Sequence, residues 1–491
     1  MALTPGSQRP PAPLRAAIAP GRSSPPPATS PPGEGCHLSR RDLLGLGVLG
    51  MGALAFGVST PWDSPARAQS ATPPHRFVQI NLEGGWNSAY ATDPIVGSKV
   101  ASGTYEPVLT SAELVPKAVD AKPTLVMGPG LIPAEAAFTR LRTAFVNGVY
   151  MEVSSHDFAA QYMSSGRLSL SNSRDYPAVP ALLGAALHTF PPHVVIGTTP
   201  PLGDTRLTSP PLQAPSSGAL NTMVSGPSGA LLGPGILQEH YSAQLVADAR
   251  ALIDGLDGLV LRGLPPTYQR NLAPWRHSSE QIAQIYARNL GGALTPSVSD
   301  AMRYGFAPDS ADIGPETQLA AVFLLLKSNL CPFITMTFGS FDSHTMELAT
   351  QPPLMRRFAR ALDVFVGDLA STPDPAAPGQ TLADTTTLYI TSEFVRTPRF
   401  SSAGGTDHWQ SASAILMGRG VMDGAVIGRT GDDAMALGWD GQAAVAPTES
   451  TRLLPDHLVA TILANVGTEA LANAVSTVRL NGLFAGTGGK G

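Results

Sequence analysis

The sequence predicts a single α/β domain in which a mainly parallel central sheet is flanked by helices. Short apolar or β-branched runs alternate with longer segments of helical spacing, and several of the short runs end in polar or glycine-rich loops. Charged residues make up 14% of the 491 residues, which include 50 Gly and 46 Pro. This composition is typical of a globular chain that is rich in loops.

The predicted strands begin near residues 77, 148, 331, 385 and 412. The first covers residues 76–82 and ends at a glycine pair, Gly84 and Gly85. Paired glycines after a strand allow backbone N–H groups to approach an anion, although a tight turn is the simpler interpretation. The other strands are expected over residues 148–153, 331–338, 385–391 and 413–417, where apolar and β-branched residues concentrate.

Helical spacing of apolar residues predicts helices over residues 133–147, 159–165, 236–261, 278–290, 316–328, 354–369 and 455–466. All of them belong to one predicted domain, residues 75–485. Residues 198–235 are rich in Pro, Gly and Ser, and a loop of this length is unusual inside a compact domain. We interpret this stretch as an insertion or lid over a site, with a disordered surface loop as the alternative.

The chain before this domain has the features of an export signal. Residues 1–38 are rich in Pro, Ser and Ala, which predicts disorder. Residues 39–68 then contain Arg40 and Arg41, an apolar run over residues 43–58 and a small-residue cleavage motif ending at Ala68. The adjacent arginines are typical of the twin-arginine pathway. We therefore expect the twin-arginine export machinery as a partner and cleavage near Ala68. The product should be periplasmic or extracellular, without a stable membrane anchor. The alternative is an uncleaved segment that anchors the protein in the membrane.

Charge and cysteine content argue against a nucleic-acid-binding protein and against a disulfide-stabilised one. The formal net charge is −5, whereas nucleic-acid binding requires a basic face, so no nucleic-acid partner is expected. The two cysteines are Cys36 and Cys331, and only the second lies in the predicted mature chain. That chain therefore has no intramolecular disulfide.

Carboxylates and imidazoles follow four of the predicted strands. In an open α/β sheet, ligands bind outside the carboxyl ends of strands, so these side chains are expected to meet there. All offer oxygen or nitrogen, which suits Zn²⁺ or Mn²⁺ better than Mg²⁺ or Ca²⁺. Such a set would serve two ions that together clamp a phosphoryl or sulfuryl group. The candidate ligands are Asp93, His156, Asp342, His344, Glu393, Asp407 and His408.

Two other side chains have the chemistry of catalytic groups. Ser155 lies where a predicted strand gives way to a helix, which favours an anion or a nucleophilic hydroxyl. Arg396 could bind a non-bridging oxygen of a phosphate-type ester in a bidentate manner. We expect Ser155 to line the same cavity as His156, and Arg396 to lie at its rim.

Several of these motifs occur together in a known family. The twin-arginine signal, the glycine pair, S-H-D-F at residues 155–158, F-D-S-H at 341–344, S-E-F-V-R-T-P at 392–398 and G-T-D-H at 405–408 occur in this order. In this pattern the chain resembles the exported domain-of-unknown-function family 1501, which is grouped with the alkaline phosphatase and sulfatase superfamily. The resemblance covers residues 77–466 and implies an alkaline phosphatase-like three-layer sandwich.

The resemblance also implies roles for individual residues. Asp342 and His344 look like the Asp…His pair of one metal, and His408 like the last histidine ligand. Glu393 stands where the late strand usually ends in an Asp-His pair. A carboxylate is expected near the glycine pair, but that position holds Asn87, and Asp93 is our substitute.

Further departures from the superfamily concern the reaction. Val395 replaces a usual glycine, and Ser155, followed by Ser154, is the best-placed nucleophile. No cysteine lies in a sulfatase-type modification motif, which argues against formylglycine chemistry. The sequence thus favours a metal-dependent hydrolase of phosphate-type or related esters. The alternative is a secreted protein that metal stabilises and that acts in binding or assembly without catalysis.

Overall fold

A computed structural model describes residues 75–94, 115–171, 176–187, 193–197, 212–214, 296–305, 314–339, 341–466 and 469–485. All of them lie within one compact unit, Met51–Gly491. The predicted disordered segment 1–38, the signal peptide 39–68 and the helices over 236–261 and 278–290 fall outside the described residues. The predicted insertion at 198–235 does so too, except for Leu212–Ala214, which forms a strand.

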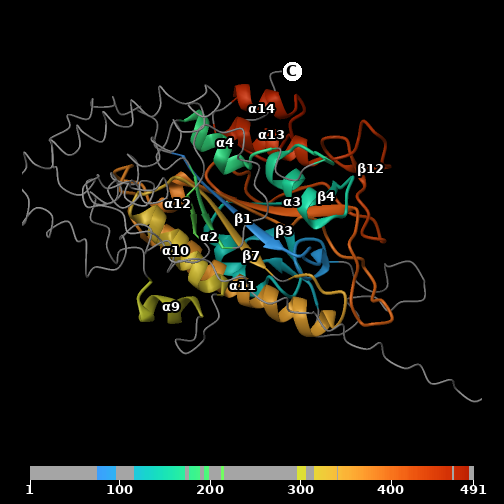
Figure 1. Ribbon diagram of the computed structural model, residues 1–491, viewed down its shortest axis with the longest axis horizontal. Helices are drawn as coiled ribbons and strands as arrows, with labels where there is room; N and C mark the ends of the chain where they lie inside the picture. Colours follow the sequence, from blue (N-terminus) through green and yellow to red (C-terminus); the bar gives the residue numbers. More distant parts are fainter. Residues whose placement is uncertain are drawn as a thin grey trace, which may run out of the picture. The chain divides into compact units, whose positions relative to one another are not determined.

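The described chain is built on a large, mostly parallel sheet (Figure 1). Its strand order is β10-β4-β9-β8-β1-β7-β5-β6. β9 runs antiparallel to both of its neighbours, and the other pairings are parallel. The strands are β1 Arg76–Glu83, β4 Thr143–Tyr150, β5 Val194–Ile196, β6 Leu212–Ala214, β7 Phe333–Gly339, β8 Thr386–Thr391, β9 Ser411–Gly418 and β10 Ala425–Ile427.

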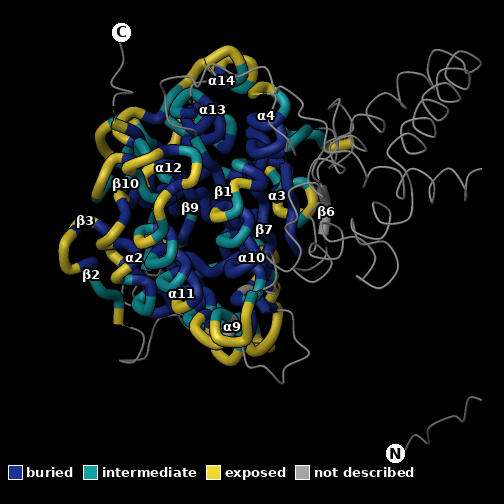
Figure 2. Tube along the Cα trace, turned by 90° about the vertical axis from the view of Figure 1, so that its left-hand side faces the viewer, coloured by how far each residue is buried: buried dark blue, intermediate teal, exposed yellow. Residues whose placement is uncertain are grey.

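Helices cover both faces of this sheet because side chains alternate between the faces along each strand. On β1, Val78 and Ile80 belong to one apolar cluster and Phe77 to another. The first cluster includes residues of α2 Glu135–Arg140, α9 Val298–Tyr304, α10 Pro315–Lys327, α11 Glu347–Ser371 and α12 Leu382–Thr385. The second includes residues of α3 His156–Ser165, α4 Val179–Ala186, α13 Pro455–Asn465 and α14 Glu469–Val475. In Figure 2 the buried strands lie between α13 and α14 above and α11 and α9 below.

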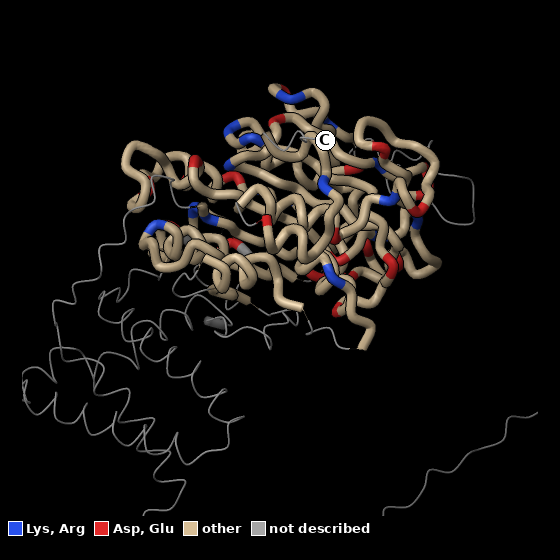
Figure 3. Tube along the Cα trace, turned by 90° about the horizontal axis from the view of Figure 1, so that it is seen from above, with Lys and Arg blue, Asp and Glu red and all other residues tan. Residues whose placement is uncertain are grey.

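The remaining elements are short. They are η1 Ser88–Tyr90, η4 Ile132–Ala134, the antiparallel pair β2 Lys117–Val119 and β3 Lys122–Met127, and the pair β11 Gly438–Trp439 and β12 Ala444–Val445. Basic and acidic residues are interspersed along the described chain (Figure 3). None of the helices in the described segments is both long and apolar enough to span a bilayer.

The prediction of a helix over residues 133–147 was wrong beyond Arg140. Leu141 is extended, with φ −103° and ψ 148°, and ends α2. The next residues form β4, which pairs with β9 on one side and β10 on the other. Apolar residues at helical spacing can also occur in a buried strand, and here long-range pairing decides between them.

The long helix α11 also differs from its prediction. It begins at Glu347, although the sequence suggested residue 354, because Pro352 and Pro353 normally interrupt a helix. The structure accommodates both prolines in the second turn. This earlier start matters for the site, because it brings Glu347 and Gln351 beneath the loop that follows β7.

Candidate metal centre

The glycine pair after β1 brings two distant loops together. Gly84 and Gly85 have φ angles of +109° and +76°, which other residues rarely adopt. A Cβ atom on Gly84 would clash with the backbone of Asp342, and one on Gly85 would clash with the ring of Phe394. Only glycine therefore lets this turn pack against the loop after β7 and the loop after β8. β1 lies between β7 and β8 in the sheet, so all three loops leave the same edge.

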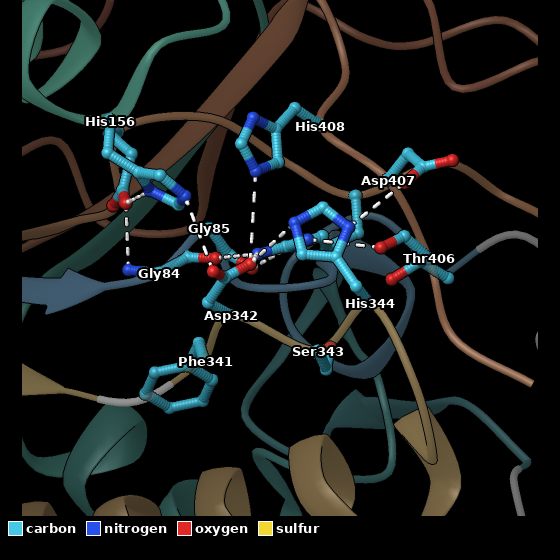
Figure 4. Close-up of polar contacts among 12 residues, drawn as sticks. Gly84, Gly85, His156, Phe341, Asp342, Ser343, His344, Thr406, Asp407 and His408 are labelled. Atoms are coloured by element: carbon cyan, nitrogen blue, oxygen red, sulfur yellow. Dashed lines mark hydrogen bonds and ion pairs between the residues drawn. The ribbon is translucent and has the colours of Figure 1, made fainter. Parts of the chain in front are cut away.

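Asp342 lies at the centre of the group and faces three imidazoles (Figure 4). Its Oδ2 is 3.6 Å from Nε2 of His156, and its Oδ1 is 3.1 Å from Nε2 of His344 and 3.8 Å from Nε2 of His408. The histidines come from the start of α3, the loop after β7 and the loop before β9. Ligand atoms of His156, Asp342 and His408 all lie within 4.8 Å of one another, which is a spacing that one ion can bridge.

His408 has a protonation pattern that fits a metal ligand. Its Nδ1 donates a hydrogen bond to the carbonyl oxygen of Ser154 at 2.7 Å. Because a carbonyl only accepts, Nδ1 carries the proton and the neutral ring keeps a lone pair on Nε2. That Nε2 is buried and has no hydrogen-bond partner among the described residues. Burial lowers the pKa of His408, and His156, Arg396 and His344 act in the same direction, whereas the bond to Ser154 opposes them; the net lowering of the pKa favours the neutral ring.

A lone pair on His408 thus faces the carboxylate of Asp342 with no proton donor between them. Asp342 is 44% exposed, but the His408 lone pair that faces it is buried, and two acceptors facing each other are unfavourable unless a cation lies between them. The arrangement of two imidazoles and one carboxylate therefore fits a divalent ion, with Zn²⁺ or Mn²⁺ favoured by these donors.

Two carboxylates orient the imidazoles from behind. Nδ1 of His156 is 2.6 Å from Oε1 of Glu393, and Nδ1 of His344 is 3.0 Å from Oδ1 of Asp407. The bond to Glu393 raises the pKa of His156, against the opposing effect of burial. Carboxylates that hold the far nitrogen of a histidine fix its ring and increase its basicity as a ligand. Glu393 and Asp407 thus reach the group through histidines, in positions that sequence reasoning had assigned to direct ligands.

Glu393 is further held in place by the fold. It is 4% exposed, and its oxygens also accept from Gly84 N at 2.7 Å and from the hydroxyl of Ser392 at 3.0 Å. The glycine turn therefore contributes a backbone donor to the site, as the sequence suggested, but the anion it contacts is a protein carboxylate. Asp407, in contrast, is 70% exposed.

Arg396 does not lie at the rim, where the sequence had placed it. Its side chain is fully buried, and it donates to the carbonyls of Gly84, Gly85 and Thr406 and to Oδ1 of Asp342. These bonds occupy the guanidinium, so it is a positioning residue for the glycine turn and for Asp342. Burial raises the pKa of Asp342, but the bond and charge of Arg396, together with His344 and His156, outweigh burial and lower it overall.

The structure does not bring Asp93 into the group. Its carboxylate accepts hydrogen bonds from the backbone N–H and the hydroxyl of Thr430, in the loop after β10. Burial raises the pKa of Asp93, although the bonds from Thr430 oppose this effect. Ser155 is exposed and is the N-cap residue of α3, directly before His156, with no side-chain capping bond.

A buried polar network beneath the site was missed by sequence reasoning. Glu347 is fully buried and accepts from Asn87 at 2.9 Å, from Thr406 at 2.8 Å and from Ser343. Burial raises the pKa of Glu347, and these three bonds oppose the rise. Gln351 links the same loops by donating to the carbonyls of Gly85 and Phe341.

This network explains the departure at Asn87. Its side-chain oxygen accepts from Ala89 N at 3.0 Å while its amide N–H₂ donates to Glu347. A carboxylate could not donate to Glu347, so asparagine serves the network at the position where the resemblance implied a carboxylate. The signal available in the sequence was Glu347, an acidic residue three positions after His344, the last residue of F-D-S-H.

A cavity of about 370 Å³ lies beside the group. It shares Asp407 with the histidine group, because this carboxylate both lines the cavity and contacts His344. Its lining residues are Thr397, Pro398, Arg399, Phe400, Ser401, Asp407, Trp409 and Asp433.

One protein family matches the part of the chain that carries most of the site. The family described as "Protein of unknown function (DUF1501)" matches residues 292–476. That range contains Asp342, His344, Glu393, Asp407 and His408. No curated protein matches the chain significantly. The family description states no activity, so function must be argued from the site.

Two solved structures of enzymes are similar to the chain at low TM-scores. An alkaline phosphatase from the Antarctic bacterium TAB5 is 13% identical, with a TM-score of 0.28, over 70% of this chain and 91% of that one. The lipoteichoic acid synthase LtaP from Listeria monocytogenes is 9% identical, with a TM-score of 0.31, over 88% of this chain and 98% of the other.

Proposed function

We propose that the protein is an exported, divalent-metal-dependent hydrolase of phosphate-type or related esters, with an alkaline phosphatase-like three-layer fold. The observation that carries the metal is the buried Nε2 of His408, which faces Asp342 and neither accepts nor donates a hydrogen bond within the part of the chain that the structure describes. His156, Asp342 and His408 would hold one ion. His344, whose far ring nitrogen contacts Asp407, lies next to them and would supply a ligand for a second ion.

Exposure favours a catalytic site over a purely structural one. The side chains of His156, Asp342 and His344 are 34%, 44% and 49% exposed. Structural metal sites are closed, whereas catalytic sites keep a position open for substrate. Solvent reaches this group directly, so an ester can reach it too.

The chain's own residues divide the remaining work. A bound ion would supply positive charge to the oxygens of the reacting group. Arg396 holds Asp342 in place through its guanidinium, and Glu393 holds the ring of His156. Ser155, exposed at the N-terminus of α3, is the proposed nucleophile because its neighbour His156 belongs to the ligand group. The cavity beside Asp407 would receive the alcohol part of the ester.

One observation favours the alternative of a metal-stabilised binding or assembly protein. Arg396, the residue predicted to bind the anion, is buried and uses four of its five N–H donors on protein acceptors. If Arg396 does not bind the anion, a substrate could instead reach the guanidinium of Arg399, which lines the adjacent cavity.

Metal analysis and turnover of the purified mature chain test this proposal. Asp342→Asn should lower metal content and abolish hydrolysis of aryl phosphates and phosphodiesters, and chelator should do the same to the native chain. Saturating metal at about 100 times its Kd should stabilise the native fold by about 2.7 kcal/mol, and Asp342→Asn should lose this gain. Asp363→Asn, which changes a half-buried carboxylate paired with Arg140 outside the site, is the matched control.

The outcomes separate the candidates. Metal binding that depends on Asp342, with no turnover of any ester, would support the binding or assembly protein. A chain that binds no metal would reject both. Recovery of the protein only from the cytoplasm, uncleaved near Ala68, would reject the export part of the proposal.

A further inference from the structure

The cavity beside the histidine group has a mixed lining that limits what it can bind. Two aromatic side chains, Phe400 and Trp409, line it together with two carboxylates, Asp407 and Asp433, and one guanidinium, Arg399. Its volume of about 370 Å³ falls within the range of small-molecule sites, roughly 300–1,000 Å³. Aromatic walls with a few convergent polar groups are typical of such sites.

The lining is held by the fold and has free hydrogen-bonding capacity. The indole N–H of Trp409 donates to the carbonyl of Asp433 at 3.0 Å, which joins the two walls. Asp433 Oδ1 accepts from Met435 N at 3.0 Å, and its Oδ2 has no partner within the described segments. Arg399 likewise forms no ion pair with a residue that the structure describes.

We propose that this cavity binds a neutral, polyhydroxylated group, so that the substrate is a phosphate-type ester of a carbohydrate. This inference rests on the proposed function for the position of the ester, which the metal ligands would hold. Hydroxyl groups both donate and accept, so they can pair with the carboxylates and with the guanidinium. The apolar C–H faces of a sugar ring can pack on Phe400 or Trp409.

Other classes of alcohol fit this lining less well. Two carboxylates against one guanidinium repel an anionic group such as a nucleotide or a phosphorylated peptide. A purely aliphatic or aryl group would cover Oδ2 of Asp433 and the guanidinium of Arg399 without offering either a hydrogen bond, which is costly. A neutral polyol avoids both penalties.

Direct binding tests this inference without requiring turnover. The probes are the 1-phosphates of glucose, galactose, mannose and N-acetylglucosamine, compared with phenyl phosphate and AMP in the presence of Zn²⁺. At least one sugar phosphate should bind at least tenfold more tightly than phenyl phosphate and should quench tryptophan fluorescence. Trp409→Phe should remove the quenching. Trp439→Phe, which changes a half-buried tryptophan outside the cavity, should retain it.

A second substitution separates the cavity from the metal site. Asp433→Asn keeps an oxygen for Met435 N but removes the charge, and it should raise the Kd of the sugar phosphate at least tenfold with metal content unchanged. The inference would be overturned if phenyl phosphate or AMP bound most tightly of all the probes. It would also be overturned if Asp433→Asn bound the sugar phosphate as tightly as the native chain does. Sugar phosphate that binds in this way without being hydrolysed would support the cavity assignment and reject the hydrolase.

Discussion

Replacing Arg396 by Met tests whether this residue builds the site or binds substrate. The buried guanidinium donates to four acceptors, and its removal leaves the carbonyls of Gly84 and Thr406 without that donor. The carbonyl of Gly85 keeps a bond from Gln351. An unsatisfied buried acceptor costs roughly 1–3 kcal/mol. Asp342 is 44% exposed, so losing its ion pair adds little.

We therefore expect Arg396→Met to lower the free energy of unfolding by about 4 kcal/mol, from a typical total of about 5–15 kcal/mol. The assay is urea unfolding of the metal-depleted chain, followed by fluorescence and circular dichroism. Arg399→Met, which removes a half-exposed guanidinium from the neighbouring cavity, should change stability by only about 0.5 kcal/mol. A loss below about 1 kcal/mol for Arg396→Met, with weaker substrate binding, would refute the positioning role.

Two further predictions concern the loop before β9 and the acid stability of the core. Gly405→Ala should weaken metal binding at least tenfold, as measured by metal titration, because the new Cβ would clash with the backbone of His344 and displace its ring. The matched change Gly404→Ala places its Cβ more than 4 Å from any atom of the described chain beyond its immediate neighbours. It should leave metal binding unchanged and lower the free energy of unfolding by only about 1 kcal/mol, measured by thermal unfolding, because Gly404 has a left-handed backbone. Burial lowers the pKa of His193 from 6.5 to about 3, so the unfolded state binds the proton more readily and stability is lost as the pH falls from 6.5 towards 3. At pH 4.5 this loss approaches about 2.7 kcal/mol, and His193→Gln should remove it, so that the slope of the unfolding free energy against pH falls by about 1.4 kcal/mol per pH unit. An unchanged slope in the variant would show that other groups cause the acid sensitivity.

Much of the fold and the place of the site follow from local sequence. Apolar runs with β-branched residues made the strands at residues 76, 333, 386 and 411 predictable to within three residues. Polar residues directly after those runs, Asp342 and Glu393 among them, had to lie near one sheet edge because parallel strands end on the same side. The convergence of His344 and His408 on that edge was therefore accessible from the sequence.

The tertiary structure alone decided what each of these side chains does. Arg396 donates to Gly85 from 311 residues away, and Glu347 accepts from Asn87 from 260 residues away. Nothing within either segment shows that an arginine in S-E-F-V-R-T-P is buried, or that an asparagine after the glycine pair donates to a helix glutamate. Asp93, which follows the central strand β1, likewise bonds to Thr430, which follows the edge strand β10. Local pattern determines where a polar residue lies along a strand or loop. Its hydrogen-bond partner depends on which distant segment of the chain packs against it, and that partner determines its charge state and its role.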